Sequence, residues 1–549
     1  MNGKMEELLN HLETEKILVA AIQETKLTSK SKVKKTPNYS LVRKDRGTNK
    51  GGGLAFLVHE SIPFHQEKTP VNLDSDKHLE SLTINIPSKS GDLMIRNVYI
   101  PPTASCDQQY QPPINNIFDD LNNTSLILGD FNSHHESWYS EDNQDTRGNL
   151  IIDTIASKSF GIINEDQPTR VTATASTAPD LSIASVNIMP TTTWSVDKIL
   201  NSDHLPITIS VQADIIKCRA GKRTYINFDK ADWTKFTDTT ENVFANATPT
   251  NNIYKDELFF RKTLQNAAKH SIPAGRIPKT YNSVPTEAAN LIDERNELRK
   301  NDPTNPEINV LNNNINKKID EHKKTKWTEH LKSCDRGSKK LWKTIKNLNS
   351  PQQTTNNQGI NFNNKINNNP KKMANMFNSQ FTPPSNNKPS KRLRTTLRHL
   401  KNKPKNQEVN ITVSQTIAAI KKSKNSKAIG PDGISPIMLK YLGLNGIRYL
   451  TRLFNISVNQ SQIPTIWKVG RIIPLLKPGK PSDQGTSYRP ISLLSPAAKI
   501  LEAILLPEIS KSLNLADHQH GFRKGRSTLT ALQDISENIT KGLNKKNTC

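Results

Sequence analysis

Short apolar runs bounded by polar residues are the feature that most constrains the fold of residues 1–215. They are 95–100 (IRNVYI), 124–132 (TSLILGDFN), 180–186 (DLSIASV) and 205–211 (LPITISV). Runs of this length bounded by Asn, Asp, Gly or Pro are typical of β-strands. Residues 6–17 instead place Leu8, Leu9 and Leu12 at helical spacing. Strands mixed with helices, with polar loops at the strand ends, predict a layered α/β domain.

Charge is distributed unevenly along the 549 residues, whose net charge is +25. Residues 1–215 contain 19 Lys and Arg against 27 Asp and Glu, whereas the rest of the chain contains 57 and 24. Such a long basic stretch favours a polyanionic partner, because each neutralised phosphate releases counterions. We therefore expect binding to nucleic acid, with a basic solvated surface as the alternative.

The composition excludes several classes of protein. No apolar stretch approaches the roughly 18 residues of a membrane span, and the first residues lack the pattern of a signal peptide. The cysteines are far apart, which excludes a disulfide scaffold, and none forms a C-x-x-C pair for zinc; they are Cys106, Cys218, Cys334 and Cys549. We expect an intracellular, soluble protein with no membrane partner and no disulfide-linked partner.

Beyond residue 255 the sequence changes character. Residues 255–350 predict basic helices, in which the expected packing residues are Trp327, Leu331, Leu341 and Trp342. Residues 351–370 are rich in Asn and Gln and of low complexity, which predicts a linker or loop. From about residue 410 the sequence again predicts regular elements, including a helix at VSQTIAAIKKSK and a strand at GRIIPLL.

Four polar clusters stand at the ends of apolar runs in the first 215 residues. They are Gln23-Glu24-Thr25, Gly129-Asp130-Phe131-Asn132, Pro179-Asp180 and Ser202-Asp203-His204. A lone Asp after a strand is usually a cap or a turn residue. Four clusters that combine carboxylate, amide and imidazole groups instead suit metal-assisted phosphodiester hydrolysis, in which carboxylates hold a hard cation and activate water.

These clusters also carry a family resemblance. The segments IQETKL, NVYIPP, LGDFNSHHESW, APDLSIAS and SDHLPI occur in the order found in the endonuclease domain of non-LTR retrotransposons, which they resemble. That domain is a member of the endonuclease/exonuclease/phosphatase superfamily, so the resemblance implies a four-layer α/β sandwich. It also implies Mg²⁺ as the cofactor, with Mn²⁺ as an alternative.

The resemblance implies a role for each matching residue. The residues that would bind the metal are Glu24 and Asp203. Asp130 would be the catalytic base, and Asn132 would position it. His204 would stabilise the phosphoryl charge, Asp180 would orient His204, and Tyr99 would place a hydroxyl near the phosphate. His134 is expected at the rim of the site, with packing in an exposed loop as the alternative. The family's first strand ends in Trp-Asn-x-x-Gly. Here Met1-Asn2-Gly3 takes that place, so we expect the first strand and its Asn to be missing.

The second half carries a resemblance of its own. Segments 425–435, 463–480, 487–505 and 518–532 are similar to the opening blocks of a non-LTR reverse transcriptase. By position, Lys477 and Arg489 resemble residues that contact the incoming nucleotide, and Arg523 belongs to a basic loop that could follow a strand. Solvated loop charges are the alternative for each. The carboxylate motifs of the polymerase palm are not present, so we expect no polymerisation by this chain.

Together these patterns predict an α+β multidomain protein, truncated at both ends, that resembles jockey-like non-LTR retrotransposon proteins. The expected parts are an endonuclease/exonuclease/phosphatase-like domain (1–212), a basic helical connector (213–350), an Asn-rich and basic linker (351–409) and a partial reverse-transcriptase fingers region (410–549). The implied function is to nick target DNA, so that reverse transcription of the element RNA is primed there.

The implied site of action is the nucleus, after synthesis in the cytoplasm. Two alternatives remain open. One is an apurinic repair endonuclease with a basic tail, and the other is a catalytically dead nucleic-acid-binding remnant.

Overall fold

The computed structural model describes residues 4–544 with short internal gaps. The gaps are 29–30, 32, 34–35, 37, 47–50, 90, 108–109, 173, 218–223, 277–283, 336, 350–358, 363–364, 368, 383–389, 403–408 and 514. The opening Met1-Asn2-Gly3 and the first part of the Asn-rich stretch therefore lie outside the described residues, as do Cys218 and Cys549. The chain divides into two compact units: Met1–Arg223, Arg276–Pro384 and Leu476–Arg489, and the remainder.

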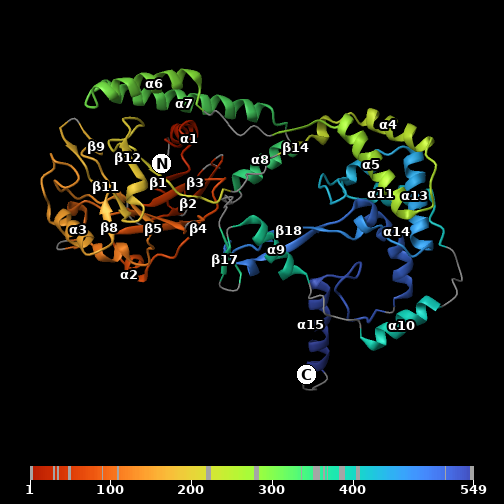
Figure 1. Ribbon diagram of the computed structural model, residues 1–549. Helices are drawn as coiled ribbons and strands as arrows, with labels where there is room; N and C mark the ends of the chain where they lie inside the picture. Colours follow the sequence, from red (N-terminus) through yellow and green to blue (C-terminus); the bar gives the residue numbers. More distant parts are fainter. Residues whose placement is uncertain are drawn as a thin grey trace. The chain divides into compact units, whose positions relative to one another are not determined.

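Two sheets form the centre of the first unit (Figure 1). The smaller is antiparallel with the order β1-β3-β2, and its strands are β1 (Val19–Ile22), β2 (Tyr39–Lys44) and β3 (Leu54–His59). The larger has the order β4-β5-β6-β7-β11-β8, and its strands are β4 (His65–Gln66), β5 (Glu80–Ile86), β6 (Leu93–Tyr99), β7 (Ser125–Asp130), β8 (Phe160–Ile162) and β11 (Asp180–Ser185). Its pairs are antiparallel except β6 with β7.

Helices cover the outer faces of these two sheets. The smaller sheet packs against α1 (Met5–Thr14), and the larger packs against α3 (Thr146–Ala156) and the 3₁₀ helix η2 (Ile114–Phe118). The remaining elements of the sandwich are α2 (Val71–Asp74), β9 (Arg170–Val171), β10 (Ser176–Thr177), β12 (Thr192–Val196), β13 (Ile207–Val211) and the 3₁₀ turns η1 (Thr103–Ser105) and η3 (Met189–Thr191). Strands β12 and β13 pair with each other, as do β9 and β10.

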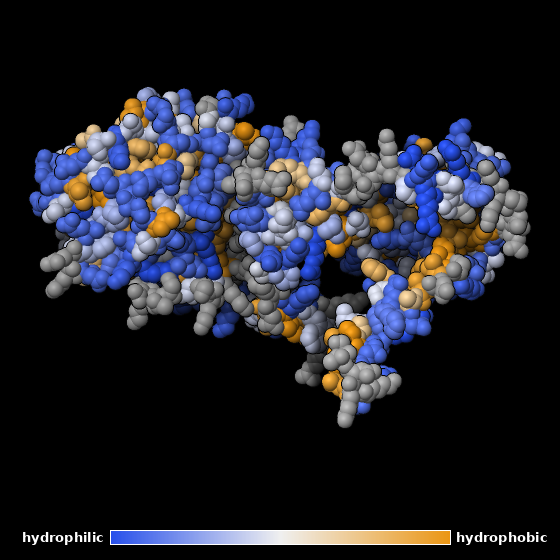
Figure 2. Space-filling model, turned by 90° about the horizontal axis from the view of Figure 1, so that it is seen from below, coloured by the Kyte–Doolittle hydropathy of each residue, from blue (hydrophilic) through white to orange (hydrophobic). Residues whose placement is uncertain are grey.

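Three hydrophobic clusters fill the three interfaces between the four layers. Leu12 of α1 packs with Leu57 of β3, Phe56 of β3 packs between the two sheets, and Ile127 of β7 packs with Ile151 of α3. Neighbouring residues of β3 enter different clusters because side chains alternate across a strand. In Figure 2 the sandwich, at left, presents mainly hydrophilic residues. The expected four-layer α/β sandwich is confirmed.

Most elements expected in the first 215 residues are present. The runs at 95–100, 124–132, 180–186 and 205–211 give β6, β7, β11 and β13, and the helical spacing at 6–17 gives α1. Among the described helices, none is long and apolar enough to cross a bilayer.

The rest of the first unit is mainly helical. It contains α6 (Thr286–Asn301), α7 (Glu307–Lys332), α8 (Lys339–Asn349), β16 (Ile360–Phe362), β17 (Lys365–Asn367) and α9 (Pro370–Phe381). One expectation about these helices is wrong, because Trp327, Leu331 and Trp342 are 43%, 43% and 65% exposed and are not packing residues. Trp327 and Leu331 share one face of α7, whereas Trp342 lies on α8, and none of the three is buried by the described residues.

The second unit is built from helices on both sides of the predicted linker. Its elements are β14 (Thr224–Ile226), α4 (Trp233–Ala245), α5 (Ile253–Ser271), α10 (Lys391–Asn402), α11 (Val413–Lys422), α12 (Pro436–Lys440), α13 (Leu444–Asn459), α14 (Pro496–Ser512) and α15 (Thr528–Asn544). Strands β15 (Ala274–Arg276), β18 (Arg471–Leu476) and β19 (Tyr488–Leu493) each cross a unit boundary. The 3₁₀ turns η4 (Phe228–Lys230) and η5 (Thr465–Lys468) belong to the second unit, and η6 (Gly485–Ser487) belongs to the first.

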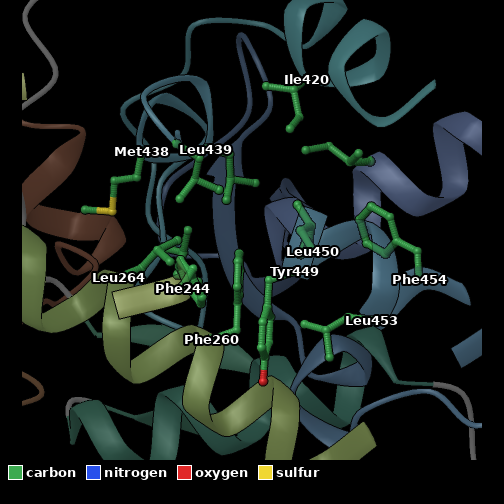
Figure 3. Close-up of a cluster of buried hydrophobic side chains, with 14 of the residues drawn as sticks. Phe244, Phe260, Leu264, Ile420, Met438, Leu439, Tyr449, Leu450, Leu453 and Phe454 are labelled. Carbon is green, nitrogen blue, oxygen red and sulfur yellow. The ribbon is translucent and has the colours of Figure 1, made fainter. Parts of the chain in front are cut away.

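One large hydrophobic core holds the second unit together (Figure 3). Phe244 of α4 and Phe260 of α5 pack there with Tyr449 and Phe454 of α13. Residues 224–275 therefore complete the core of the region that resembles reverse-transcriptase fingers. The stretch 213–350, expected as one connector, thus contributes α4 and α5 to this unit and α6, α7 and α8 to the other.

Replacing Phe56 with Ala is expected to destabilise the sandwich. Phe56 is fully buried between the two sheets, and removing a buried Phe leaves a cavity that costs about 3–5 kcal/mol. Hydrogen exchange in peptides covering β3 and β6 measures the loss. Val71→Ala is the matched control, since Val71 is 81% exposed, and an equal change in both variants would contradict the layered core.

Candidate active site

The ends of three neighbouring strands bring the first site residues together. Asp130 ends β7, and its register partners are Tyr99 of β6 and Asp180 of β11. Gly129 allows this close approach, because a Cβ at that position would lie 1.9 Å from the carbonyl oxygen of Val98. The Gly-Asp pair in GDFN thus has a physical reason. Glycine lets the strands meet, and the next residue extends the row of polar side chains at the sheet edge.

Asp130, Asp180 and His204 form a compact cluster. One oxygen of each carboxylate and one imidazole nitrogen of His204 all lie within 4.8 Å of one another. His204 Nδ1 donates to Asp180 Oδ2 at 2.8 Å, and the same oxygen accepts from the Thr169 hydroxyl at 2.7 Å. This arrangement fixes the imidazole and leaves its Nε2 edge for another group.

Burial and mutual charge shift the pKa values in this cluster. Burial raises the pKa of Asp130 to about 7, and the neighbouring charge of Asp180 acts in the same direction. Burial opposes the charged form of His204, but the hydrogen bond and the charge of Asp180 outweigh it and raise the pKa of His204 to about 9. At neutral pH His204 is therefore an imidazolium, and the crowded Asp130 carboxyl titrates near the pH at which a general base works best.

Glu24 and Asp203 lie beside this cluster, each with its own cation. Glu24 accepts from the Tyr99 hydroxyl at 2.6 Å and pairs with Lys26 at 3.1 Å. Asp203 accepts from Arg170 Nε at 3.0 Å.

Both of these carboxylates are ionised at neutral pH. Burial alone would raise their pKa values, but the bond from Tyr99 lowers that of Glu24 and the bond from Arg170 lowers that of Asp203. The charge of His204 also lowers both, so both carboxylates lie near the imidazolium. Conversely, burial and the bond to Glu24 raise the pKa of the Tyr99 hydroxyl, which stays neutral.

Asn132 and His134 have local partners. Asn132 has a left-handed backbone (φ 46°). Its side-chain amide donates to the carbonyl oxygen of Ile100 at 2.9 Å, and its backbone N–H donates to Asp130 Oδ1 at 3.0 Å. His134 Nδ1 bonds Asp142 at 3.0 Å. Asn132 therefore touches Asp130 directly, whereas His134 holds the loop that follows.

The expected nucleotide-binding residues lie elsewhere in the chain. Lys477 follows β18 and donates to the carbonyl oxygen of Thr486 at 2.9 Å, and Arg489 is exposed on β19. Arg523, in the other unit, donates to the carbonyl oxygen of Ala516 at 3.2 Å. The role of these three cations stays a prediction.

Two residues that support the site are absent from the sequence predictions. Asn97 is fully buried on β6, accepts from Gln23 at 2.7 Å and donates to the carbonyl oxygens of Ile22 and Ala55 at 3.1 Å, so it ties the two sheets together next to Glu24. Arg147 is buried on α3 and donates to three carbonyl oxygens, those of Pro101, Phe131 and Asn132, at 3.0–3.1 Å.

A signal for Asn97 exists in the sequence. Asn97 and its neighbour Arg96 are polar residues inside an otherwise apolar run from Met94 to Ile100. A polar residue inside a buried strand needs a partner in the interior, but its identity depends on the packing of two sheets.

Comparisons with known proteins agree with the motifs. A family model described as endonuclease-reverse transcriptase matches residues 93–208, which include Asp130, Asp180, Asp203 and His204. The probable RNA-directed DNA polymerase from transposon BS of Drosophila melanogaster is 25% identical over 93% of this chain and 58% of its own length. The RNA-directed DNA polymerase from mobile element jockey of Drosophila funebris is 23% identical over 91% of this chain and 56% of its own.

Residues 93–208 thus match the endonuclease-reverse transcriptase family model, and the chain as a whole is similar to polymerases of non-LTR retrotransposons. The predicted resemblance, and with it membership of an enzyme family, is confirmed. This chain spans a little more than half the length of the two full relatives. Among solved structures, the endonuclease domain of TRAS1, a telomere-specific non-LTR retrotransposon, is 17% identical, covers 39% of this chain and 94% of that domain, and has a TM-score of 0.32.

The substitution Asp180→Asn is expected to lower the pKa of His204. Without the carboxylate, burial of the imidazole becomes the main influence, and the pKa should fall from about 9 by about 2. NMR titration of the His204 ring in the metal-free protein measures it, with Asp153→Asn on the exposed face of α3 as control. An unchanged titration would contradict the pairing of His204 with Asp180.

The same shift has a consequence for stability. Because the folded pKa lies above the ordinary value of 6.5, the stabilisation that this pair gives is complete below pH about 6.5. It is lost as the pH rises through about 9.

Proposed function

We propose that the first unit is a metal-dependent endonuclease that nicks a strand of target DNA. The observation that carries the proposal is the cluster of Asp130, Asp180 and His204 at adjacent strand ends, within the residues that match the endonuclease-reverse transcriptase family. Such a site offers a base and a fixed cation within reach of one another, and these are the two groups that hydrolysis of a phosphodiester needs.

Each residue then has a role that follows from its contacts. Asp130 accepts the proton of the attacking water, and the backbone N–H of Asn132 that donates to Asp130 holds the carboxylate in place. His204, kept protonated by Asp180, presents Nε2–H to a phosphate oxygen, where it stabilises the charge that develops. Tyr99 keeps Glu24 oriented through its 2.6 Å hydrogen bond.

A divalent cation fits the donor chemistry of Glu24 and Asp203. Their oxygens are hard ligands of the kind that Mg²⁺ and Mn²⁺ take, both carboxylates are ionised, and their side chains are 41% and 53% exposed. Protonated His204 has no free lone pair for a metal, which favours these two carboxylates over the imidazole cluster as the ligands. When bound, the cation supplies positive charge to the phosphate oxygens.

The proposal extends to the reaction that the nick serves. The 3′-hydroxyl of the cut strand would prime reverse transcription of element RNA in the nucleus, with Lys477, Arg489 and Arg523 contacting nucleotide or template. The relatives named RNA-directed DNA polymerases from mobile elements support this extension, as does the basic second half of the chain.

Asp130→Asn is expected to reduce nicking of supercoiled plasmid by the full chain about 10²–10⁴-fold, the range for loss of a general base. Gel analysis of the nicked circle over time measures the rate. Asp153→Asn, the same change on the exposed face of α3, is the control and should match the unaltered chain.

This assay also separates the alternatives. Equal background cleavage by all three folded proteins would contradict the proposal and favour a nucleic-acid-binding remnant. Cleavage confined to a plasmid with abasic sites would favour an apurinic endonuclease.

Removal of metal is expected to stop the nicking, and added Mg²⁺ or Mn²⁺ to restore it. Glu24→Gln and Asp203→Asn should each raise the Mg²⁺ concentration needed for half-maximal rate, by about tenfold or more, because each removes a charged oxygen ligand. Lys300→Gln, on α6, serves as the control. Rates that are unaffected by a chelator would contradict metal dependence.

A further inference from the structure

The helical hairpin α6–α7 lies over α1 of the sandwich in the first unit (Figure 1). Its own buried apolar cluster contains only residues from 284 to 319, such as Val284 and Ile315. The contacts that join the hairpin to the sandwich include two ion pairs. Lys323 pairs with Glu6 at 3.2 Å, and Arg295, fully buried, pairs with Glu7 at 2.5 Å. Polar contacts of this kind fix one register, whereas apolar packing tolerates several.

Arg299 lies one helical turn after Arg295, so both face the sandwich. Its guanidinium donates to the carbonyl oxygens of Ile199, at 3.1 Å, Leu200 and Ser202. Those carbonyls belong to the loop between β12 and the Asp203-His204 pair. The loop thus receives three hydrogen bonds from a helix about 100 residues later in the chain, and Lys4 donates to a fourth carbonyl oxygen, that of Asn201.

The burial of Arg299 is costly for a contact that serves only to join two parts. Arg299 is 4% exposed. Burial and the charge of Arg295 lower its pKa, whereas the charges of Asp203 and Glu7 act in the opposite direction. Its Nε lacks a partner among the described residues. Burying a guanidinium costs free energy, which its hydrogen bonds to carbonyl oxygens and the nearby carboxylates offset in part.

The loop that Arg299 holds is itself strained. Leu200 has a left-handed backbone with φ 65°, a conformation that residues other than glycine rarely adopt. Such a backbone persists only where surrounding contacts determine it. Arg299 bonds the carbonyl oxygens of Ile199, Leu200 and Ser202 and so, together with Lys4 on Asn201, supplies that constraint three residues before Asp203.

The sandwich uses the same arrangement at its other catalytic loop. Arg147 of α3 donates to three carbonyl oxygens, two of which belong to Phe131 and Asn132, immediately after Asp130. One buried arginine therefore holds the loop after Asp130, and another holds the loop before His204. The first comes from the sandwich itself and the second from the hairpin.

From these contacts we infer that α6–α7 is a working part of the nuclease and that Arg299 is a positioning residue, which sets the backbone from which Asp203 and His204 reach the site. The inference rests on the proposed endonuclease function for its catalytic consequence. Its structural consequence, the order of residues 197–205, is independent of activity. An endonuclease fragment that ends near residue 212 would lack this element.

Arg299→Gln in the full chain tests the inference, with Lys300→Gln as the matched control. Lys300 is the next residue of the helix, is exposed and pairs only with Glu297 through its side chain. We expect Arg299→Gln to lower kcat for plasmid nicking about 10- to 100-fold, the effect of a small misplacement of catalytic groups, with KM for DNA within twofold. Lys300→Gln should change neither.

Two further measurements keep the test decisive. Hydrogen exchange should become faster at residues 197–205 in Arg299→Gln, while exchange in β7 stays as in the unaltered chain. Arg299→Lys keeps the charge but reaches fewer carbonyl oxygens. Its kcat and its exchange rate at 197–205 should therefore lie between those of Arg299→Gln and the unaltered chain. Arg299→Lys replaces Arg299→Gln if that variant does not fold. Unchanged kcat and unchanged exchange at 197–205 in a folded variant would overturn the inference.

If the unaltered chain does not nick DNA, the proposed function fails, but the exchange measurement still decides the role of Arg299. Faster exchange confined to 197–205 would support the positioning role without catalysis. Faster exchange throughout the sandwich would instead assign Arg299 to general stability and overturn the inference.

Discussion

The register of β6, β7 and β11 is the constraint on which the candidate active site depends. It aligns Tyr99, Asp130 and Asp180 in one row at the sheet edge, and a slip of one residue would turn an entire strand to the other face. The same register forces two buried carboxylates together. Their repulsion is relieved by His204 and Thr169, which both donate to Asp180. The strands therefore set the positions of the side chains, and the hydrogen bonds offset the repulsion between the two carboxylates.

Loops deliver the other half of the site, and buried polar side chains hold them. Arg147 gathers carbonyls after Asp130, Arg299 gathers carbonyls before Asp203, and Asn97 joins the two sheets beside Glu24. Buried carbonyls need donors, and in irregular backbone those donors cannot come from a strand ladder. A side chain that bonds several carbonyls therefore does for a loop what pairing does for a strand.

Local patterns could predict the strands and the residues at their ends. Each of Asp130, Asp180 and His204 follows or precedes an apolar run, and the structure places all three in one cluster. Periodicity could not predict what covers a helix, so Trp327 and Trp342 were expected inside and are exposed. Nor could it find Arg299, whose partners lie about 100 residues earlier in the chain. A polar residue inside an apolar run signals that Asn97 needs an interior partner, but no local pattern identifies the distant partners of Asn97, Arg147 or Arg299.

The balance of charge at the site argues for a cation as a working part of it. The carboxylates gathered there are Glu24, Asp130, Asp180 and Asp203, and the neighbouring cations are Lys26, Arg170 and His204. A DNA phosphate would add further negative charge to a place where carboxylates already crowd Asp130 enough to raise its pKa. Because attraction between unlike charges strengthens in a partly buried site, a divalent ion would offset both the phosphate and the carboxylates. The proposed need for metal is therefore in keeping with the electrostatics at the strand ends, independently of the partner proposed for the basic second half.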